Sequence, residues 1–396
     1  MSREIAIIGV GVYPFGRYPG KTFSDLGTVA CRDALRDAGI NWKDIQIVVG
    51  GIDTWSGISG GHVGNVLEMM LGNTGIPVIN VQIGCATGAG ALGTLCAMIQ
   101  SGACDIGLAV GTSVSPQGFL PTLVPVVENP GDLDNLRFKM TGCPNPGFFA
   151  MECTRRMHDY GTTERHLAKV RVKASKNGAL NPYARYRKVL TEEEVLASPM
   201  VCYPLRLFEV CALSDGAAAA IVCSMDFARR HTRKPITFAG WSLATRRWGD
   251  VQLGGPHLSN VSIPDGPDFT DAADAARMVY ERAGLGPKDV DVFELPDGMS
   301  YSELTYMEKV GICEPGEADR LVEEGATEIG GKVPVCPSGG FLSFGESTPA
   351  MGIWQACELV WQLRGEAGAR QVEDAKVGYA QTVGLFQNNG ACILKR

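Results

Sequence analysis

The chain has 396 residues, 45% of them hydrophobic and 20% charged, which describes a globular protein of two or three domains with ample core. Its formal net charge of -7 argues against nucleic acid as a partner. No segment reaches about 18 uninterrupted apolar residues, so no membrane span is expected.

Cysteine usage and the N-terminus bear on the compartment. The thirteen cysteines are odd in number and none pair as Cys-x-x-Cys, so we interpret them as reduced thiols and predict no metal in this chain. The N-terminus lacks the apolar core of a signal peptide. Together these features predict a cytoplasmic protein.

An internal repeat begins early in the chain. Residues 38–48 match residues 283–293 at a constant offset, and both runs end a helix and begin a strand. Ser24 is the expected N-cap of the first of these helices, and Gly39 is the glycine expected to close it. The repeat predicts a duplicated α/β unit.

Cys85 lies where an apolar strand near residues 80–83 passes through a glycine into a helix of small residues. A thiol at a helix N-terminus faces unsatisfied N–H groups and the positive end of the dipole, which lower its pKa and favour the thiolate. Small side chains along residues 86–91 would let this helix lie close to neighbouring backbone. The position predicts a nucleophile, and the alternative is an inert buried cysteine.

A second helix is predicted at a matching place in each half. Apolar residues recur at helical spacing over residues 92–99 and over residues 353–361, each time before a glycine and a strand. Both helices are apolar on broad faces, which is typical of helices that lie between layers. We therefore expect a layered α/β fold in which two similar halves pack helix against helix.

Residues 115–210 differ in composition from both halves and include an amphipathic basic helix near residues 163–177. We interpret this stretch as an inserted loop domain, which favours a lid or binding loop, with a contact between two copies of the chain as an equal alternative. The predicted domains are residues 1–114 with 211–238, residues 115–210, and residues 239–396.

Three motifs carry a resemblance to a known family. Residues 84–88 read Gly-Cys-Ala-Thr-Gly, residues 214–218 read Ser-Asp-Gly-Ala-Ala, and residues 337–340 read Pro-Ser-Gly-Gly. With residues 362–368 they resemble the thiolase superfamily, specifically its sterol-carrier-protein-x-like branch, over essentially the whole chain. The resemblance implies a five-layered αβαβα fold, a CoA thioester substrate, coenzyme A as co-substrate, and making or breaking of a carbon–carbon bond beside a carbonyl.

Three loops depart from that branch. Pro296 and Gly298 stand where the branch has the histidine and the cysteine of a His-Asp-Cys-Phe loop, and Asp297 keeps the aspartate between them. Glu346 replaces the histidine of a Gly-His-Pro motif, and Gln381 replaces a histidine near the C-terminus. We interpret Asp297 as a residue that organises its loop by hydrogen bonds.

Cleavage of a β-ketoacyl thioester needs a nucleophile, donors for the oxyanion and a proton donor. Cys85 is the predicted nucleophile, and Glu346 the predicted acid or base, because burial and a neighbouring thiolate would raise the pKa of its carboxyl. The alternative for Glu346 is a solvated surface carboxylate. The oxyanion donors would be backbone N–H groups, for instance of Cys85 and Gly384, and amide side chains such as Gln381 or Asn389.

Within the branch, a retained cysteine with lost histidines most resembles the benzoylsuccinyl-CoA thiolases of anaerobic toluene degradation. This implies an acyltransferase that cleaves 2-benzoylsuccinyl-CoA with CoA to benzoyl-CoA and succinyl-CoA through an acyl-Cys85 intermediate. It also implies a homodimer core and a small companion subunit with a zinc ribbon and an OB-fold. Six basic residues of the insertion are candidates for the CoA phosphates, or else form a solvated face: Arg155, Arg156, Arg165, Lys169, Arg171 and Lys173.

Two other functions stay open. A thiolase-fold retro-aldolase for the β-hydroxyacyl-CoA side chains of steroids also lacks the histidine loops, but it is expected to use tyrosines there, and Pro296 and residues 346–348 supply none. A non-catalytic subunit that binds acyl-CoA is the third possibility, because three of the usual catalytic side chains are absent. The retention of Cys85 opposite a titratable glutamate argues against that third possibility.

Overall fold

The computed structural model describes residues 3–53, 55–116, 145–231, 234–245, 247, 270–384 and 388–396. Part of the predicted loop domain (117–144) and part of the predicted C-terminal half (248–269) lie outside the described residues. The domain boundaries stay predictions.

The first half is built from helices and strands that alternate along the chain. Its elements are β1 (Ile5–Gly16), α1 (Phe23–Ala38), a 3-10 turn (Trp42–Asp44), β2 (Val48–Gly51), α2 (Gly57–Gly60), α3 (Val63–Leu71), β3 (Val78–Val81), α4 (Thr87–Gln100), β4 (Ile106–Ser113), β7 (Asp215–Ser224) and α9 (Met225–His231). Between β4 and β7 stand α6 (Asn145–Tyr160), α7 (Glu164–Leu180), α8 (Glu192–Leu196), β5 (Met200–Cys202), β6 (Leu205–Arg206) and a 3-10 turn (Leu207–Glu209).

The second half repeats the alternation. Its elements are β8 (Ile236–Ala244), α10 (Thr270–Ala283), a 3-10 turn (Pro287–Asp289), β9 (Val292–Glu294), α11 (Ser300–Lys309), α12 (Ala318–Glu323), α13 (Gly340–Phe344), a 3-10 turn (Thr348–Ala350), α14 (Ile353–Arg364), a 3-10 turn (Gly368–Arg370), β10 (Val377–Gly384) and β11 (Asn388–Lys395). Strand β8 begins just before the predicted boundary at residue 239.

The described strands of both halves form one continuous sheet in the order β3-β2-β4-β7-β1-β8-β11-β10-β9. Read outward from the centre, β1-β7-β4-β2 and β8-β11-β10-β9 follow the same path with the same parallel and antiparallel pairings. The two halves join where Ala6 and Ile7 of β1 pair with Thr237 and Ile236 of β8. The predicted duplication is therefore confirmed.

The repeated segment has the same local structure in both halves. Helix α1 is closed by Gly39 (φ 66°) and helix α10 by Gly284 (φ 65°), and each glycine leads through a 3-10 turn into a strand. The expected N-cap at Ser24 is wrong. The N-cap is Thr22, two residues earlier, because Thr22 and Asp25 form a reciprocal capping box that satisfies two backbone donors.

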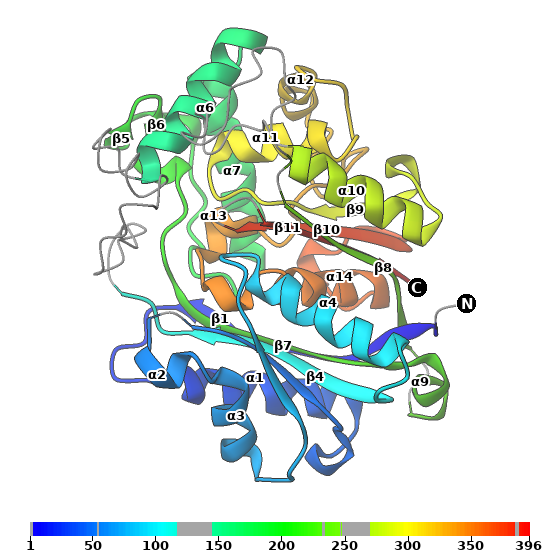
Figure 1. Ribbon diagram of the computed structural model, residues 1–396. Coiled ribbons are helices and arrows are strands. Elements are labelled where there is room, and N and C mark those ends of the chain that lie inside the picture. Colours follow the sequence, from blue (N-terminus) through cyan, green and yellow to red (C-terminus); the bar gives the residue numbers. More distant parts are fainter. Residues whose placement is uncertain are drawn as a thin grey trace.

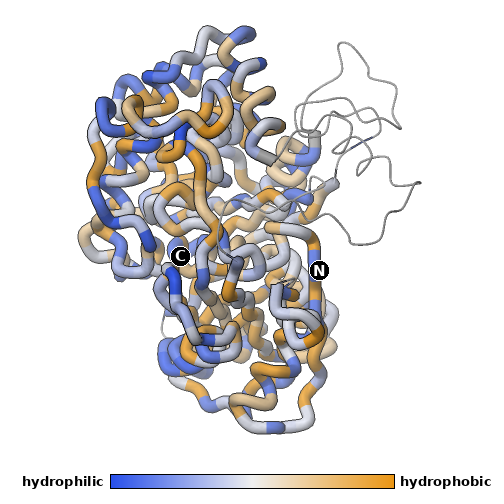
Figure 2. Tube along the Cα trace, turned by 90° about the vertical axis from the view of Figure 1, so that its left-hand side faces the viewer, coloured by the Kyte–Doolittle hydropathy of each residue, from blue (hydrophilic) through white to orange (hydrophobic). Residues whose placement is uncertain are grey.

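The elements stack in five layers (Figure 1). Helices α1 and α3 cover the outer face of the first half of the sheet, α4 and α14 lie between the two halves, and α10 and α11 cover the opposite outer face. The middle layer is almost wholly buried, as its broad apolar faces predicted, and Trp354 of α14 is 1% exposed. In Figure 2 hydrophobic residues recur along the segments inside the molecule, and hydrophilic residues gather on turns at its surface.

The inserted helices pack onto the second half. Leu167, Val170 and Ala174 of α7 share one buried apolar cluster with Leu304 of α11 and Leu342 of α13. The insertion is therefore joined to the layer that carries one wall of the site described below. Among the helices that the structure describes, none is long and apolar enough to cross a membrane.

Candidate active site

A tight turn places Cys85 between strand β3 and helix α4, as the sequence predicts. Gly84 has a φ of 63°, a conformation that favours glycine. The hydroxyl of Thr87 donates to the carbonyl of Gly84 (2.6 Å) and accepts from the N–H of Ile83 (2.9 Å). These two hydrogen bonds fix the turn, so that the Cys85 side chain stands just before the first turn of α4.

Small residues at the start of α4 let it touch the segment that follows Glu346. A Cβ at Gly88 would lie 2.0 Å from the carbonyl oxygen of Met351, and a Cβ at Gly352 would lie 2.6 Å from the backbone nitrogen of Ala89. Neither position has room for a side chain. This close approach of two backbones brings Cys85 to Glu346 across 261 residues of sequence.

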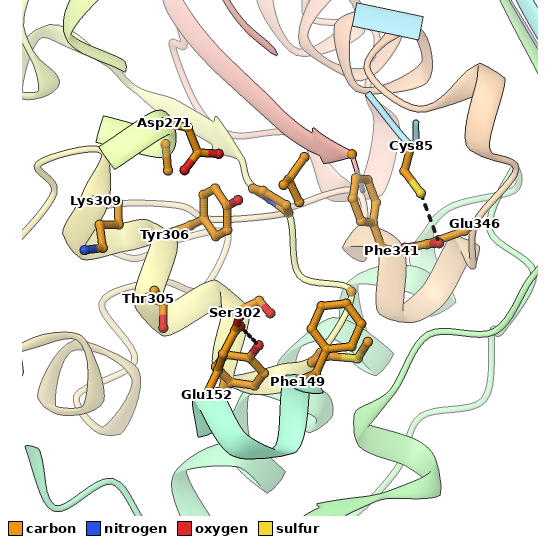
Figure 3. Close-up of a pocket in the computed structure, with 17 residues that line it drawn as sticks. Cys85, Phe149, Glu152, Asp271, Ser302, Thr305, Tyr306, Lys309, Phe341 and Glu346 are labelled. Carbon is orange, nitrogen blue, oxygen red and sulfur yellow. Dashed lines mark hydrogen bonds between the residues drawn. The ribbon is translucent and has the colours of Figure 1, made fainter. Parts of the chain in front are cut away.

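Glu346 is buried opposite Cys85, with 8% of its surface exposed. The Cys85 thiol donates a long hydrogen bond of 3.9 Å to Oε2 of Glu346 (Figure 3). The backbone of Glu346 is held on both sides, because its N–H donates to the carbonyl of Ala212 and its carbonyl accepts from the N–H of Ser214, both at 2.8 Å. The expected pair of a thiol and a carboxyl is thus present in the structure.

The electrostatics of Glu346 favour its protonated form more than an exposed glutamate would. Burial raises the pKa of its carboxyl, and hydrogen bonds from the thiols of Cys211 and Cys85 partly oppose that rise. A carboxyl with a raised pKa can both accept and return a proton near neutral pH. The arrangement is therefore suited to acid–base chemistry beside a nucleophile.

A pocket that is partly open to solvent leads to this pair. Phe149 and Phe341 lie on the side of the pocket near Cys85, whereas Asp271, Tyr306 and Lys309 lie on the other side (Figure 3). The remaining lining residues are Glu152, Ala272, Pro296, Gly298, Met299, Tyr301, Ser302, Thr305, Val383 and Gly384. The pocket thus combines an aromatic wall beside the nucleophile with a polar wall farther away.

Gly384 lies where the sequence placed it, beside the nucleophile turn. A Cβ at this position would lie 2.9 Å from the backbone nitrogen of Cys85 and 2.8 Å from that of Ala86. Only glycine allows the end of β10 to approach the turn this closely. Gly384, itself one predicted oxyanion donor, therefore lies next to the backbone N–H of Cys85, the other predicted backbone donor.

Gln381 and Asn389 lie elsewhere, in a buried network behind the polar wall. The side-chain amide of Gln381 donates to the carbonyl of Ala272 (3.1 Å) and to Oδ1 of Asn389 (2.9 Å), and Asn389 donates to Asp271. The hydroxyl of Tyr306 also donates to Asn389 (3.2 Å). Neither amide lines the pocket, so the structure does not bring them to Cys85 and instead ties them to Asp271 and Tyr306.

Asp297 holds two loops of the site together. Its Oδ1 accepts the N–H of Phe341 at 2.6 Å, at the start of α13, and burial raises its pKa to about 7. Helix α13 is fixed from its other side by Phe344, whose ring stacks on Trp354 with 4.2 Å between ring centroids. This arrangement fits the expected organising role.

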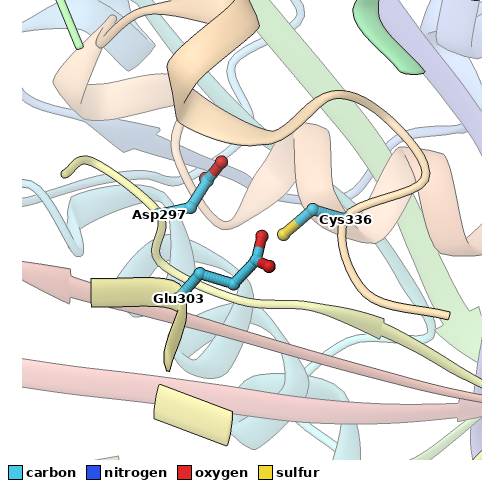
Figure 4. A group of neighbouring side chains, drawn as sticks. All are labelled: Asp297, Glu303 and Cys336. Atoms are coloured by element: carbon cyan, nitrogen blue, oxygen red, sulfur yellow. The ribbon is translucent and has the colours of Figure 1, made fainter. Parts of the chain in front are cut away.

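Asp297, Glu303 and Cys336 form a buried group whose candidate ligand atoms all lie within 4.8 Å of one another (Figure 4). The ammonium of Lys173 donates to Oε1 of Glu303 at 2.6 Å and to the carbonyl of Val335 at 3.0 Å. A cation from the chain itself therefore already balances the nearest carboxylate of this group.

Three of the six basic residues of the insertion are buried and therefore cannot form an exposed phosphate-binding face. Arg156, Arg171 and Lys173 are each at most 5% exposed, and Arg156 makes two hydrogen bonds of 2.8 Å to Glu308. The other three candidates pair with carboxylates on the surface: Arg155 with Asp159, Arg165 with Glu192, and Lys169 with Glu323. Their helical spacing indicated a charged face. Apart from the local pair of Arg155 with Asp159, their carboxylate partners lie too far away in sequence to be anticipated.

Sequence reasoning missed the polar wall of Asp271, Tyr306 and Lys309, and it also missed Cys211. Cys211 precedes β7 and its thiol contacts Glu346, but no motif or spacing relates position 211 to position 346. The only available signal was its place just before the recurring Ser-Asp-Gly-Ala-Ala turn.

Comparison with known proteins tests the resemblance to the thiolase superfamily. The model named "Thiolase, N-terminal domain" matches residues 5–226, and the model named "Thiolase C-terminal domain-like" matches residues 256–396. The chain belongs to the thiolase family. The thiolase is thus an acyltransferase, and the predicted family and layered α/β fold are confirmed.

Individual relatives cover nearly all of this thiolase. The acetyl-CoA acetyltransferase of Methanothermobacter thermautotrophicus is 36% identical over 96% of both chains. Sterol carrier protein 2 of Bos taurus is 35% identical over 97% of this chain and 71% of its own. The benzoylsuccinyl-CoA thiolase subunit BbsB of Thauera aromatica is 32% identical over 94% of this chain and 92% of its own.

Among solved structures, the one named Ltp2-ChsH2(DUF35) aldolase superposes with a TM-score of 0.84. It covers 99% of this thiolase and 97% of the matched chain at 23% identity. This likeness establishes the shared fold.

Proposed function

We propose that this thiolase cleaves a β-ketoacyl-CoA with free CoA through an acyl-Cys85 intermediate, and that its substrate is 2-benzoylsuccinyl-CoA. The observation that carries the proposal is the buried pair of Cys85 and Glu346 at the head of a pocket with an aromatic wall. The named relative BbsB supports the choice of substrate.

The chemistry follows from the pair. Glu346 accepts the proton of the Cys85 thiol, and the thiolate attacks the keto carbon next to the phenyl ring. The carbon–carbon bond then breaks, its electrons pass into the enolate of succinyl-CoA, and the Glu346 carboxyl returns the proton to that carbon. The benzoyl group remains on Cys85. The thiol of CoA next gives its proton to Glu346 and attacks the benzoyl carbonyl, which releases benzoyl-CoA and restores Cys85.

Backbone N–H groups would stabilise the oxyanion that forms when the thiolate attacks the keto carbon. The N–H groups at the start of α4 point along the helix dipole and lie beside Gly384, where a side chain would block them. The amides of Gln381 and Asn389 support the pocket wall from behind, so their role in the proposal is indirect.

The walls of the pocket fit the acyl group. Phe149, Phe341 and Met299 offer an apolar surface for a phenyl ring beside Cys85. Lys309 lines the same pocket on its polar side and is suited to the free carboxylate of the succinyl part (Figure 3).

Partners belong to the proposal as well. We place this thiolase in a homodimer core with a small companion subunit of the zinc-ribbon and OB-fold type. BbsB is named as a subunit, and the aldolase structure is named with a DUF35 component. Strand β3 lies at the edge of the described sheet with all four residues partly exposed, which suits pairing with a second copy.

The test is a thiolysis assay on the purified chain with its companion subunit. We expect 2-benzoylsuccinyl-CoA and free CoA to give benzoyl-CoA and succinyl-CoA in equal amounts, and Cys85→Ala to abolish both products. Cys31→Ala, which removes a buried thiol of α1 far from the pocket, is the matched control. Cleavage of a β-hydroxyacyl-CoA that is undiminished in Cys85→Ala would establish a retro-aldolase instead, and no turnover of any thioester would favour a binding subunit.

A further inference from the structure

The segment that leads to Glu346 is a buried loop. Residues 334–347 are all buried, yet the only α-helix among them is α13, at 340–344. Loops usually run over the surface, because the carbonyl and N–H groups of a buried loop cannot bond to water and need partners within the protein. The partners of residues 335–338, which precede α13, therefore determine where this segment lies.

Helix α7 of the insertion supplies three of these partners from one face. Three side chains spaced four residues apart each donate a hydrogen bond of 3.0 Å to a carbonyl of the loop: Lys173 to Val335, Asn177 to Cys336, and Asn181 to Ser338. A spacing of four residues places the donors on the same side of the helix. Each of the three is at most 2% exposed, so water has little access to these hydrogen bonds.

Two glycines bring the backbones of α7 and the loop into contact. A Cβ at Gly339 would lie 2.6 Å from Cα of Gly178, and a Cβ at Gly178 would lie 2.5 Å from Cβ of Ser343. The hydroxyl of Ser343 donates to the carbonyl of Ala174 at 2.9 Å, so α7 also supports α13 directly (Figure 1). This contact explains why the Pro-Ser-Gly-Gly motif at residues 337–340 needs its first glycine, a role that the proposed reaction does not assign.

One of the three donors acts where the backbone is strained. Cys336 has a φ of 52°, a conformation that residues other than glycine adopt at a cost in free energy. Its carbonyl accepts the amide of Asn177 and also the N–H of Gly339, both at 3.0 Å, and the second of these bonds closes a tight turn. The hydrogen bond from Asn177 therefore helps to keep the turn in its present conformation.

The turn passes directly into the part of the chain that forms the site. The N–H of Gly345 donates to the carbonyl of Phe341 at 2.7 Å, which makes α13 one short, closed unit. Phe341 lines the pocket at one end of this unit, and Glu346 follows its other end, 3.9 Å from Cys85. A displacement of the turn would therefore displace the aromatic wall and the carboxyl together.

We propose that Asn177 and Asn181 are positioning residues, which fix the loop of residues 335–338 on α7 and thereby hold Glu346 and Phe341 in place beside Cys85. The proposal rests on the thiolase function proposed above. Neither asparagine is among the residues that line the pocket, so neither touches the reacting atoms. Helix α7 of the insertion is then a fixed support of the active site and not a lid over it.

The first measurement is hydrogen exchange in the full chain, followed by mass spectrometry, for the wild type, Asn177→Ala and Asn181→Ala. Each variant removes one of three donors, so both are expected to fold. We expect the backbone amides of residues 341–346 to exchange about 5- to 10-fold faster in both variants, because one buried hydrogen bond that resists local opening is lost. The amides of α4 should exchange as in the wild type, since global stability does not set this effect.

Ser175→Ala is the matched control on the same helix. Ser175 is fully buried like the two asparagines, but its hydroxyl donates to the carbonyl of Val172 and accepts the N–H of Leu190, away from the loop. Its loss removes buried hydrogen bonds of α7 without removing a partner of residues 335–338. Exchange at residues 341–346 should therefore stay at the wild-type rate in this variant.

The second measurement is the rate at which iodoacetamide alkylates Cys85 as the pH is raised, with the modified peptide identified by mass spectrometry. Glu346→Gln is the reference for a site without the carboxylate. A like charge disfavours the thiolate, so the midpoint of the profile should move downward by about 1 pH unit in Glu346→Gln. We expect Asn177→Ala and Asn181→Ala to move the midpoint downward by part of that amount, and Ser175→Ala to leave it unchanged.

Three results would overturn the proposal. The first is equal exchange at residues 341–346 in the wild type and in the folded asparagine variants. The second is faster exchange with a Cys85 profile that stays at the wild-type midpoint, since the support would then not extend to Glu346. The third is a single profile shared by all the proteins, Glu346→Gln included. Neither measurement uses an acyl-CoA, so the result does not depend on whether the chain performs thiolysis.

Discussion

At the scale of single residues, the account depends on the carboxyl of Glu346. Glu346→Gln keeps the shape of the side chain but cannot exchange a proton with Cys85, which lies 3.9 Å away. We expect turnover to fall by roughly 10²- to 10⁴-fold with an unchanged melting temperature, since general acid–base catalysis contributes about that much. The measurement is kcat by thiolysis, with the exposed Glu373→Gln as the matched control. A kcat for Glu346→Gln close to that of the wild type would remove Glu346 from the mechanism.

Asp297 gives a prediction about pH and stability. Burial raises its pKa from 3.8 to about 7 in the folded chain, so the folded state holds this proton more tightly than the unfolded state. The stability that this group contributes is present below about pH 4 and is lost as the pH rises through 7. Asp297→Asn cannot titrate but can still accept the N–H of Phe341.

The measurement for Asp297 is the free energy of unfolding in urea at pH 5 and at pH 8. We expect the wild type to lose more stability over this interval than Asp297→Asn. Acids distant from Asp297 titrate alike in both proteins and cancel in the comparison, whereas the substitution also removes a charge that raises the pKa of Glu294. Equal pH dependence of the two proteins would show that Asp297 keeps an ordinary pKa.

At the scale of elements, contact between helix α4 and the segment after Glu346 sets the geometry of the site. Gly88→Ala would place a methyl group 2.0 Å from the carbonyl oxygen of Met351, which the backbone cannot accommodate without moving α4. Gly90→Ala is the matched control on the same helix, because its methyl group would meet side chains and no backbone atom, those of Ile83 at 2.9 Å and Val81 at 3.2 Å. We expect Gly88→Ala to lose at least about 10²-fold in kcat/KM, since a shift of about 1 Å can cost that much.

A kcat/KM in Gly88→Ala equal to that in Gly90→Ala would show that close packing of α4 does not position Cys85. Melting temperatures of both variants separate this effect from general loss of stability.

Individual helices were the part of the fold most readily predicted from sequence. The apolar spacing of α4 and α14 and the closing glycines of α1 and α10 are local signals, and each led to a helix that the structure contains. The N-cap of α1 was misplaced because Ser24 is a good capping residue in isolation, whereas Thr22 caps reciprocally with Asp25. The first residue of such a helix therefore depends on which of several nearby capping residues makes the better hydrogen bonds.

At the scale of the whole molecule, buried ion pairs join the insertion to the second half. Lys173 of α7 and Glu303 of α11 are 2.6 Å apart with side chains 2% and 0% exposed. Lys173→Met would leave a buried carboxylate without its cation, and we expect a loss of about 3 to 5 kcal/mol in the free energy of unfolding. Lys188→Met, from an exposed pair at the same distance, should change stability little. Urea denaturation of both variants measures this, and equal losses would contradict the account.

Long-range contacts explain what sequence reasoning missed. Lys173 and Arg156 read as basic residues of an amphipathic insertion, but their carboxylate partners lie 130 and 152 residues away. Cys85 and Glu346 were found because each occupies a recognisable motif, whereas Cys211 reaches Glu346 only through folding. Gln381 and Asn389 carry suitable amides, yet their donors are directed toward Asp271 and Ala272 and not toward Cys85.

The most direct test of the central claim is the intact mass of the chain after exposure to 2-benzoylsuccinyl-CoA without free CoA. We predict a benzoyl adduct that maps to Cys85, is absent in Cys85→Ala, and disappears when CoA is added. Cleavage of the substrate with no adduct on Cys85, at an undiminished rate in Cys85→Ala, would contradict the account.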